Sequence, residues 1–317
     1  MNAFRARSTV VGLTLKLTAV SAGDVEGQAQ AVNATPDSVL IRAHAEYAAG
    51  SLHRFLLGDN YRDLWTTPIK VPLLDLRSYA GGIRPTKTGG GRQTINLRFE
   101  SADSTEFVFR PVYKPLANFP DPFKGTIIWN IVLDARSGLH PLAPLVVPPV
   151  LSAIGALHPR PQLFVMPDDT LLGNFRKDFA GALGTLEEVP NAPSHGGPFA
   201  GADTIIDSDE LLERIDRSPG QRVGTHGLLA VRMVDMLLGD NDRHAGQWKW
   251  ARLEPGGDWA PIPRDRDNVF VSYEGFLPKL SRMVSSRLVT FDSGYAKGAA
   301  LFHKRSNSTG ECLAEST

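Results

Sequence analysis

Two polar segments in the second half of the chain contain the side chains best suited to chemistry. They are Asp242-Arg243-His244-Ala245-Gly246-Gln247 and Arg264-Asp265-Arg266-Asp267-Asn268. Carboxylate and amide oxygens are ligands that suit Mg²⁺ or Mn²⁺, and a further carboxylate nearby can accept a proton. A metal ion that offsets charge and a base that orients an attacking hydroxyl are the parts that phosphoryl transfer requires.

The residues between these segments predict a β-hairpin. Residues 248–253 and 259–263 have strand-like sequences, and the turn sequence Pro255-Gly256-Gly257-Asp258 lies between them. Because a hairpin brings its two ends together, we expect the first polar segment to lie beside Asp265 and Asp267.

A glycine cluster and a lysine form a second candidate region. Gly89, Gly90 and Gly91 precede two strand-like runs, 93–99 and 106–114, and the second run ends at Lys114. A flexible glycine-rich backbone can close over phosphates, and a lysine can pair with them. The cluster alone is a weak signal, because it lacks the spacing of a P-loop.

A second cation competes for the role of Lys114. Arg110 lies an even number of positions earlier and therefore on the same face of the predicted strand. A lysine at the end of a strand is also often solvent-exposed. The sequence leaves open which of these two cations would bind phosphates.

The segment Asp242-Arg243-His244, followed by Gln247 and then by Asp265, resembles the catalytic and metal-binding segments of the atypical branch of the protein-kinase-like superfamily. That branch includes phosphatidylinositol kinases, HipA-type kinases and secretory-pathway kinases. Gln247 and Asp265 lie 5 and 23 positions after Asp242. The strings GDNDRHAGQWKW and PIPRDRDNVF are also similar to a group of bacterial, exported kinase-like proteins. The likeness is detailed over 239–270, partial over 81–115 and architectural elsewhere.

The resemblance implies a bilobed kinase-like fold, ATP and Mg²⁺ or Mn²⁺ as cofactors, and a hydroxyl of a protein, glycan or lipid as the phosphate acceptor. It also implies a role for each matching residue. Asp242 would be the catalytic base, Arg243 and His244 would organise the loop or face phosphates, Gln247 and Asp265 would bind metal, and Lys114 would bind the nucleotide phosphates.

Two residues depart from the family pattern. Gln247 stands where those families have Asn or Glu, and it keeps an amide oxygen without a charge. The families follow their metal-binding Asp with Phe-Gly or Asn-Gly, whereas Arg266-Asp267 follows here. Either Asp265 or Asp267 can therefore be the metal ligand, and we favour Asp265.

A lysine in this role needs an acidic partner from a nearby helix. Asp134 interrupts the apolar run 131–137, and we expect it to pair with Lys114. The alternative is that Asp134 is a satisfied helix terminus. Glu187 and Glu188 are expected to be structural or to lie near the nucleotide.

Composition excludes several classes of protein. The chain has 317 residues, and 34 basic side chains balance 34 acidic ones, which argues against nucleic-acid binding. No apolar stretch reaches the length of about 20 residues that a membrane-spanning helix needs. A single cysteine, Cys312, excludes an internal disulfide framework and a cysteine-built metal site.

The N-terminal residues predict export. Arg5 and Arg7 precede the apolar run 9–22, and Ala29-Gln30-Ala31 has the form of a signal-peptidase site. We expect residues 1–31 to be a signal peptide of an exported or periplasmic protein. The alternative is a disordered N-terminal arm of a cytoplasmic protein.

The remaining residues predict an α+β fold with two lobes. The small lobe would span 32–190 and contain an antiparallel sheet, a hinge would follow at 191–201, and a mainly helical lobe would span 202–317. The elements that we expect are a front helix at 38–57, several short helices over 126–157, strands at 163–166 and 184–189, a helix at 207–215, and a buried helix at 226–238 that ends at Gly239.

Two other functions stay open at this point. Only 50 residues follow Asp267, and a kinase-like large lobe normally continues with further helices. The chain is therefore an enzyme or a non-catalytic kinase-like scaffold that binds a nucleotide. A metal-dependent phosphoester hydrolase would use Asp242, His244, Asp265 and Asp267 without a nucleotide.

Overall fold

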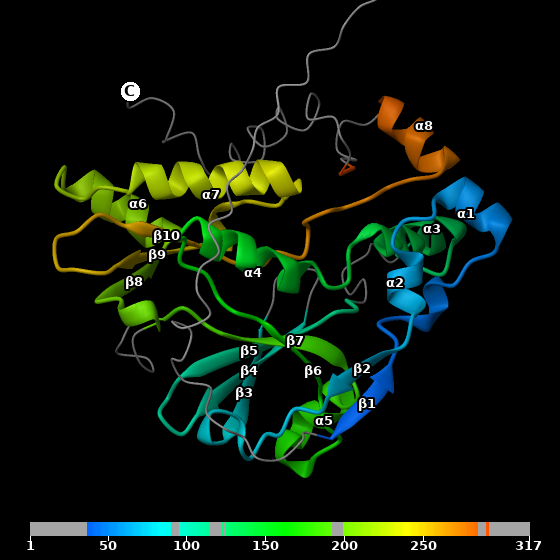
Figure 1. Ribbon diagram of the computed structural model, residues 1–317, viewed down its shortest axis with the longest axis horizontal. Coiled ribbons are helices and arrows are strands. Elements are labelled where there is room, and N and C mark those ends of the chain that lie inside the picture. Colours follow the sequence, from blue (N-terminus) through cyan, green and yellow to red (C-terminus); the bar gives the residue numbers. More distant parts are fainter. Residues whose placement is uncertain are drawn as a thin grey trace, which may run out of the picture. The chain divides into compact units, whose positions relative to one another are not determined.

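The computed structural model describes residues 37–89, 95–114, 122, 124–191, 199–284 and 290–291. Antiparallel sheets and helices share this part of the chain (Figure 1), which confirms the α+β class. The predicted signal peptide at 1–31, Gly90, Gly91 and most of the predicted hinge lie outside the described residues.

A five-stranded antiparallel sheet is formed by residues 83–188. Its strand order is β3-β4-β5-β7-β6. The strands are β3 (Ile83–Gly89), β4 (Asn96–Ser101), β5 (Glu106–Pro111), β6 (Gln162–Val165) and β7 (Leu183–Glu188). The predicted strands at 93–99, 106–114, 163–166 and 184–189 are thus present with small changes of boundary.

The two faces of this sheet differ in polarity. One face is buried in a hydrophobic core that includes Leu97 and Phe99 of β4 and Phe107 and Phe109 of β5. Side chains alternate along a strand, so the intervening residues lie on the opposite face. That opposite face contains the charged residues Arg98, Glu106, Arg110 and Glu187. The sheet therefore presents charge on the side away from its core.

A three-stranded sheet contains the predicted hairpin. Its order is β10-β9-β8, with β8 (Thr204–Asp207), β9 (Trp248–Arg252) and β10 (Ala260–Pro263). Pro263 pairs with Trp248 at the open end of the hairpin, so the residues that follow β10 lie beside those that precede β9. This confirms the hairpin and its effect on the two polar segments. A separate pair of strands, β1 (Ser38–Ile41) and β2 (Ile69–Pro72), is also antiparallel.

Helices surround the sheets. The α-helices are α1 (Ser51–Leu57), α2 (Arg62–Thr66), α3 (Ile127–Ala135), α4 (Ala143–Ala153), α5 (Arg176–Phe179), α6 (Ser208–Arg217), α7 (Thr225–Leu238) and α8 (Phe276–Val284). Short 3₁₀ helices are η1 (Ala45–Tyr47), η2 (Tyr79–Gly81), η4 (Arg136–Gly138), η5 (Thr170–Phe175), η7 (Phe199–Gly201) and η8 (Ala245–Gln247). The short helices predicted over 126–157 and the helix predicted at 207–215 are confirmed.

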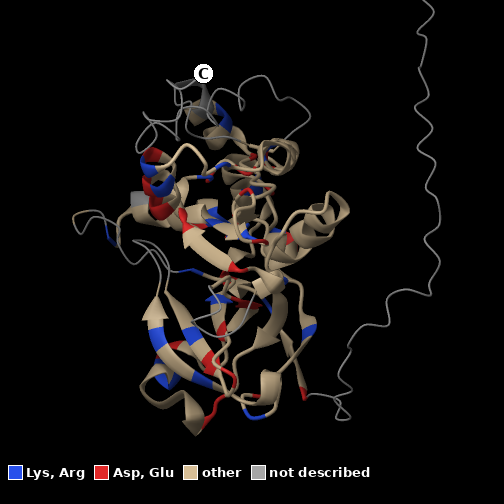
Figure 2. Cartoon of the chain, turned by 90° about the vertical axis from the view of Figure 1, so that its left-hand side faces the viewer, with Lys and Arg blue, Asp and Glu red and all other residues tan. Residues whose placement is uncertain are grey.

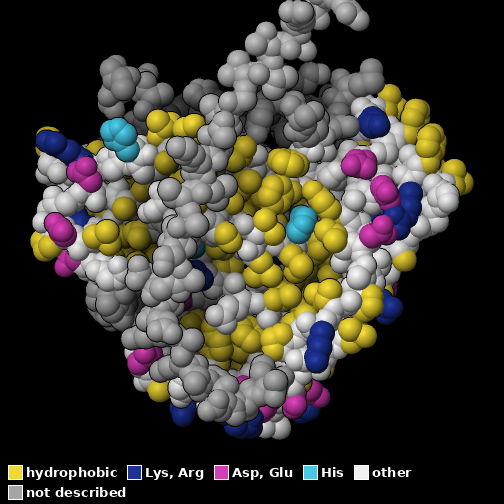
Figure 3. Space-filling view, viewed as in Figure 1, with side chains coloured by type: hydrophobic (Ala, Val, Ile, Leu, Met, Phe, Trp, Pro, Cys, Tyr) yellow, Lys and Arg dark blue, Asp and Glu magenta, His cyan; other side chains and the backbone are white. Residues whose placement is uncertain are grey.

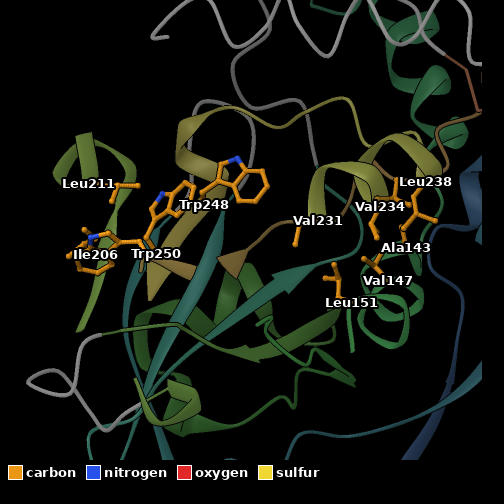
Figure 4. Packing of buried hydrophobic residues seen from close by; sticks show 12 residues of the cluster. Ala143, Val147, Leu151, Ile206, Leu211, Val231, Val234, Leu238, Trp248 and Trp250 are labelled. Atoms are coloured by element: carbon orange, nitrogen blue, oxygen red, sulfur yellow. The ribbon is translucent and has the colours of Figure 1, made fainter. Parts of the chain in front are cut away.

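The hairpin and helix α7 belong to one hydrophobic core (Figure 4). Val231, Val234 and Leu238 of α7 pack toward Ala143, Val147 and Leu151 of α4. Trp248 and Trp250 of β9 join the same core, and their indole rings stack with centroids 6.0 Å apart. The helix that precedes the first polar segment and the strand that follows it are therefore anchored in the same core.

The predicted front helix at 38–57 is wrong. Residues Ser38–Ile41 form β1, whose Val39 lies opposite Val71 of β2, and the helix α1 begins only at Ser51. A long-range strand pairing therefore outweighs the local helical pattern of apolar residues. Strand β3 was not predicted, because only Ile83 of its residues is buried and no alternation is visible.

Helix α7 is buried on one face only, which corrects the prediction of a fully buried helix. Leu229 and Met233 are each 61% exposed. The helix does end at Gly239, whose φ of +68° is the left-handed conformation that favours glycine. Gly239 thus turns the chain from α7 into the first polar segment.

Apolar side chains are exposed in two other places. Hydrophobic residues cover the middle of the face shown in Figure 3, where Figure 1 has α4, and more lie at α1 and α8. Phe55 of α1 and Phe276 of α8 stack with ring centroids 6.3 Å apart.

None of the helices in the described part of the chain has the length and apolar character that a membrane span requires.

Gly184→Ala is expected to destabilise the protein by about 1–3 kcal/mol, because the added methyl group would overpack a core strand pair. A Cβ at this position would lie 2.3 Å from the ring of Phe109 on the neighbouring strand. Urea unfolding of the variant and the wild type measures the difference.

Gly227→Ala is the matched control. Gly227 lies in α7, and its nearest non-helical neighbour is 3.8 Å from the site of the new Cβ. The control is expected to be neutral or to stabilise by up to about 1 kcal/mol. An equal loss of stability in both variants would contradict the argument from packing.

Candidate functional site

Charged side chains from the five-stranded sheet meet charged side chains from the end of the hairpin. The Nε atom of Arg110 donates a hydrogen bond to Glu187 of β7 at 3.0 Å, and its Nη1 atom lies 3.7 Å from a carboxylate oxygen of Asp265. The ammonium group of Lys114 forms an ion pair with Asp267. Acidic and basic residues gather between the sheet in the lower half of Figure 2 and the helices above it. The structure thus brings together both candidate regions of the sequence.

The two ion pairs leave little free space. A cavity of about 40 Å³ lies beside them, and its lining includes Arg110, Lys114, Asp265 and Asp267. About 10–15 Å³ is enough for one water molecule, so the cavity holds only a few waters. A larger anionic ligand can enter only if it takes the place of a carboxylate as the partner of Arg110 or Lys114.

Asp265 has an unusual backbone conformation. Its φ is +55°, in the left-handed region that non-glycine residues rarely adopt, although Asp adopts it more readily than most. The Nε2 atom of Gln247 donates a hydrogen bond to the Asp265 carboxylate at 3.4 Å. Burial acts to raise the pKa of Asp265, but the positive charges of Arg110 and Lys114 outweigh it and lower that pKa. Asp265 is therefore an anion at neutral pH.

A buried cluster of four charges supports the loop between α7 and β9. Arg266 donates hydrogen bonds to Asp235 of α7 and, at 2.7 Å, to Asp240. Arg243 lies 3.6 Å from Asp235 and 3.8 Å from Asp240. Both carboxylates have 0% exposure. The cluster joins the end of α7 to both polar segments.

Arg243 organises the loop. Its guanidinium group donates hydrogen bonds to the carbonyl oxygens of Arg264 at 2.6 Å and Gln247 at 3.1 Å, and it lies over the ring of Trp248. Burial, with the positive charge of Arg266, lowers the pKa of Arg243 to about 10, so the group stays protonated at pH 7. These contacts join the loop before β9 to the segment after β10.

His244 and Asp242 occupy different environments. His244 is exposed, and its Nδ1 atom accepts a hydrogen bond from the backbone of Gly246 at 3.1 Å, which caps η8. Asp242 accepts a hydrogen bond from Asn268 at 3.4 Å, and Asn268 also donates to Asp267 at 3.0 Å. Asn268 therefore connects the predicted base to the acidic pair.

Asp134 is not the partner of Lys114, which corrects the prediction. Its carboxylate accepts two hydrogen bonds from Arg62 at 2.8 and 2.6 Å and lies 2.9 Å from the ring of His53. Arg62 has 0% exposure, so it needs a charge partner close by. Asp134 therefore joins α3 to α2 and α1. The acidic partner of Lys114 is Asp267.

Gly89 is the one member of the glycine cluster among the described residues. It ends β3 opposite Asn96, and a Cβ at this position would lie 2.7 Å from the side-chain oxygen of Asn96 and 3.5 Å from the Nε atom of Arg98. The absence of a side chain at Gly89 therefore gives the side chain of Asn96 room at the strand end.

Glu187 belongs to the site, although the sequence suggested only a general position for it. It lines the same cavity as Lys114 and binds Arg110. Two cations, Lys249 of β9 and Arg264 after β10, also lie in this region and were not predicted. The alternation of side chains along β9 places Lys249 on the face opposite Trp248 and Trp250, and this pattern could have identified Lys249 from the sequence.

The donor atoms at the end of the hairpin suit a hard divalent cation. Asp265 and Asp267 provide carboxylate oxygens, and the amide of Gln247 contacts Asp265. In the part of the chain that the structure describes, no group of three or more His, Cys, Asp or Glu side chains forms a metal-binding cluster. Two carboxylates and an amide oxygen, with water or phosphate oxygens in the other positions, is a usual pattern for Mg²⁺.

No family model, curated protein or solved structure matches this chain.

Asp134→Asn is expected to lower the free energy of unfolding by about 3–5 kcal/mol at pH 7, because it leaves Arg62 buried without a charge partner. Burial acts to raise the pKa of Asp134, but hydrogen bonds from Arg62 and His53 outweigh it and lower the pKa. A lowered pKa gives stability that is present above about pH 3.9, the value in the unfolded chain, and is lost as the pH falls through the folded-state value. The difference in the free energy of unfolding between the variant and the wild type should therefore be smaller at pH 3 than at pH 7, as measured by urea unfolding.

Asp63→Asn is the control. Asp63 binds Arg54 at 2.7 Å, but its side chain is 77% exposed. Exposed ion pairs contribute at most about 1 kcal/mol. The role assigned to the Arg62 pair would be contradicted if Asp134→Asn lowered the free energy of unfolding by no more than Asp63→Asn does. It would also be contradicted if the decrease for Asp134→Asn were the same at both pH values.

Proposed function

We propose that the chain is an ATP- and metal-dependent phosphotransferase of the kinase-like kind, which acts on a hydroxyl group. The single observation that carries the proposal is the pairing of two cations with two carboxylates from the end of the hairpin, Asp265 and Asp267. The cations are Arg110 of β5 and Lys114, which follows that strand. Such a site offers cations for phosphates and carboxylates for a divalent metal in one cleft.

The proposed phosphate ligands are Arg110 and Lys114. Each is now held by a carboxylate, and a phosphate oxygen can replace a carboxylate oxygen as a hydrogen-bond acceptor. Arg110 keeps a second partner in Glu187, which fixes its guanidinium group while one side is free to bind a ligand. Arg110 is therefore the better positioned cation, and Lys114 the more easily released one.

The proposed metal ligands are Asp265, Asp267 and Gln247. The backbone at Asp265, two residues after β10, has a left-handed conformation. The side chain of Asp265 contacts that of Gln247, and the side chain of Asp267 accepts a hydrogen bond from Asn268. A bound Mg²⁺ or Mn²⁺ would offset negative charge on the transferring phosphoryl group. Displacement of the two ion pairs by ligand would leave both carboxylates available to a cation.

The proposed base is Asp242. It lies at the end of the loop that Arg243 and the buried charge cluster hold in place. The side-chain amide of Asn268 donates hydrogen bonds to both Asp242 and Asp267, which keeps the proposed base close to the acidic pair. Asp242 would orient the acceptor hydroxyl and take its proton.

The bilobed arrangement is part of the proposal. The five-stranded sheet would be the small lobe, and the three-stranded sheet with α6 and α7 would belong to the larger one. Asn191, at the start of the predicted hinge, donates a hydrogen bond to Glu106 of β5 at 2.8 Å. The first residue of the proposed hinge thus contacts the charged face of the sheet.

Asp265→Asn is expected to weaken ATP binding in the presence of Mn²⁺ by at least about 10- to 100-fold, because a charged metal ligand is lost. Isothermal titration calorimetry with ATP, with and without Mn²⁺, measures the effect. Asp258→Asn, at the exposed turn of the same hairpin, is the control and should bind as the wild type does. Wild-type protein that binds no ATP in the presence of either metal would contradict the proposed function.

Asp242→Asn is expected to keep metal-dependent ATP binding and to lower the rate of phosphoryl transfer or ATP hydrolysis by about 10²- to 10⁴-fold, as loss of a general base does. Release of labelled phosphate and its transfer to acceptor mixtures measure the rate. ATP binding without any turnover in the wild type would instead favour a non-catalytic scaffold. Phosphoester hydrolysis that Lys114→Ala leaves unchanged would favour a hydrolase.

A further inference from the structure

Three cations approach one another between the two sheets. Arg98 lies on the charged face of β4, Lys249 on β9, and Arg264 directly after β10. Lys249 lies within electrostatic range of the cations Arg264 and Arg98 and of the acids Asp207 and Glu210. Arg264 lies within range of the cations Arg110 and Arg98 and of the acids Glu187 and Asp265. Positive charges from two separate sheets therefore converge on one region beside Asp265.

Two of these cations have no partner in the described part of the chain. Arg98 binds Glu106 at 3.1 Å. By contrast, the side chains of Lys249 and Arg264 make no hydrogen bond or ion pair with any described residue, although neither side chain is fully exposed. The nearest acid of the neighbouring strand, Asp207, uses a carboxylate oxygen to cap α6 through the backbone of Glu210.

The backbone holds both cations firmly in this position. The amide of Arg264 donates to the carbonyl oxygen of Gln247 at 2.9 Å, and the carbonyl oxygen of Arg264 accepts from Arg243. Lys249 is fixed between Ile262 and Asp207 in the register of the three-stranded sheet. The core side chains Trp248 and Trp250 prevent β9 from turning over and exposing Lys249 on the other face.

We propose that Lys249 and Arg264, with Arg98, form an anion site that binds phosphate groups of a ligand. Partly buried cations that repel one another and have no acceptor are unfavourable in the free protein, and a multiply charged anion would supply the acceptors that they lack.

This site deepens the proposed function, and its link to phosphoryl transfer rests on that function. It adds to Arg110 and Lys114 a second set of cations near Asp265, which the sequence did not predict. The shared chemistry is a chain of phosphates. Its source is either the nucleotide itself or a second phosphorylated ligand, such as a phosphorylated acceptor.

The probe for the test is sodium tripolyphosphate in a buffer that contains EDTA, so that no divalent metal takes part. Calorimetry at low ionic strength should show binding to the full-length wild-type protein. Lys249→Gln and Arg264→Gln should each weaken it at least tenfold, and Lys249→Arg should retain most of the affinity. Lys70→Gln and Arg160→Gln, at exposed positions outside the site, are the controls and should bind as the wild type does.

A thermal unfolding series checks that the variants fold. Because the cations repel one another, Lys249→Gln should melt at the same or a higher temperature than the wild type without tripolyphosphate. It should also lose the rise in melting temperature that tripolyphosphate causes in the wild type. Absence of binding to the wild type, or equal binding to the Lys249 and Arg264 variants, would overturn the proposal.

Two further arms separate this site from the proposed function and identify the ligand. Asp265→Asn should lose metal-dependent ATP binding and keep metal-free tripolyphosphate binding. Tripolyphosphate binding that depends on Lys249, in a protein that binds no ATP with metal, would support the anion site and reject the proposed function. Displacement of tripolyphosphate by ATP with Mn²⁺ would identify the nucleotide as the source of phosphates, and simultaneous binding would identify a second phosphorylated ligand.

Discussion

Two buried carboxylates, Asp235 and Asp240, and two buried guanidinium groups, Arg243 and Arg266, hold the end of α7 against the loop before β9 and the segment after β10. Burial of four charges has a large desolvation cost, and the Nε atoms of both arginines have no hydrogen-bond partner among the described residues. A hydrophobic cluster of the same volume would stabilise the fold at least as well. The charges instead fix a loop geometry, because each arginine accepts only a few positions of its acidic partners. That loop geometry positions the polar side chains that the hairpin end contributes to the candidate site, Asp242, Gln247, Asp265 and Asp267.

The five-stranded sheet supplies the other half of the site through a simple consequence of strand geometry. Alternation places Phe107 and Phe109 in the core and Arg110 on the opposite face, so the core that stabilises β5 also orients its cation. Glu187 on β7 then holds Arg110 from the same face. The sheet and the loop are stabilised separately, one by apolar packing and the other by buried charge. Their contact includes two ion pairs, which a charged ligand can exchange more readily than packed apolar surface.

The sequence was most informative where the determinants are local. The hairpin, the strand pair before Lys114 and the end of α7 at Gly239 depend on turn residues and on alternation over a few positions, and all are present. The front helix at 38–57 and the pairing of Asp134 with Lys114 depend on contacts between distant segments. Neither the pairing of β1 with β2 nor the burial of Arg62 leaves a local signal, so these features could not be predicted from the pattern.

The same reasoning explains why Lys249 and Arg264 were missed. In the sequence each is one charged residue among several near a turn, and only the folded chain shows that neither has an acceptor among the described residues. Local rules favour paired or fully solvated charges, and a fold departs from such rules mainly at functional sites. Five other non-glycine residues in the described part of the chain also have a positive φ, but three features of this kind lie close together here: the left-handed Asp265, the cations beside it and the small cavity with its ion pairs. Because stability explains none of them, ligand binding at this end of the hairpin is the more economical explanation of all three.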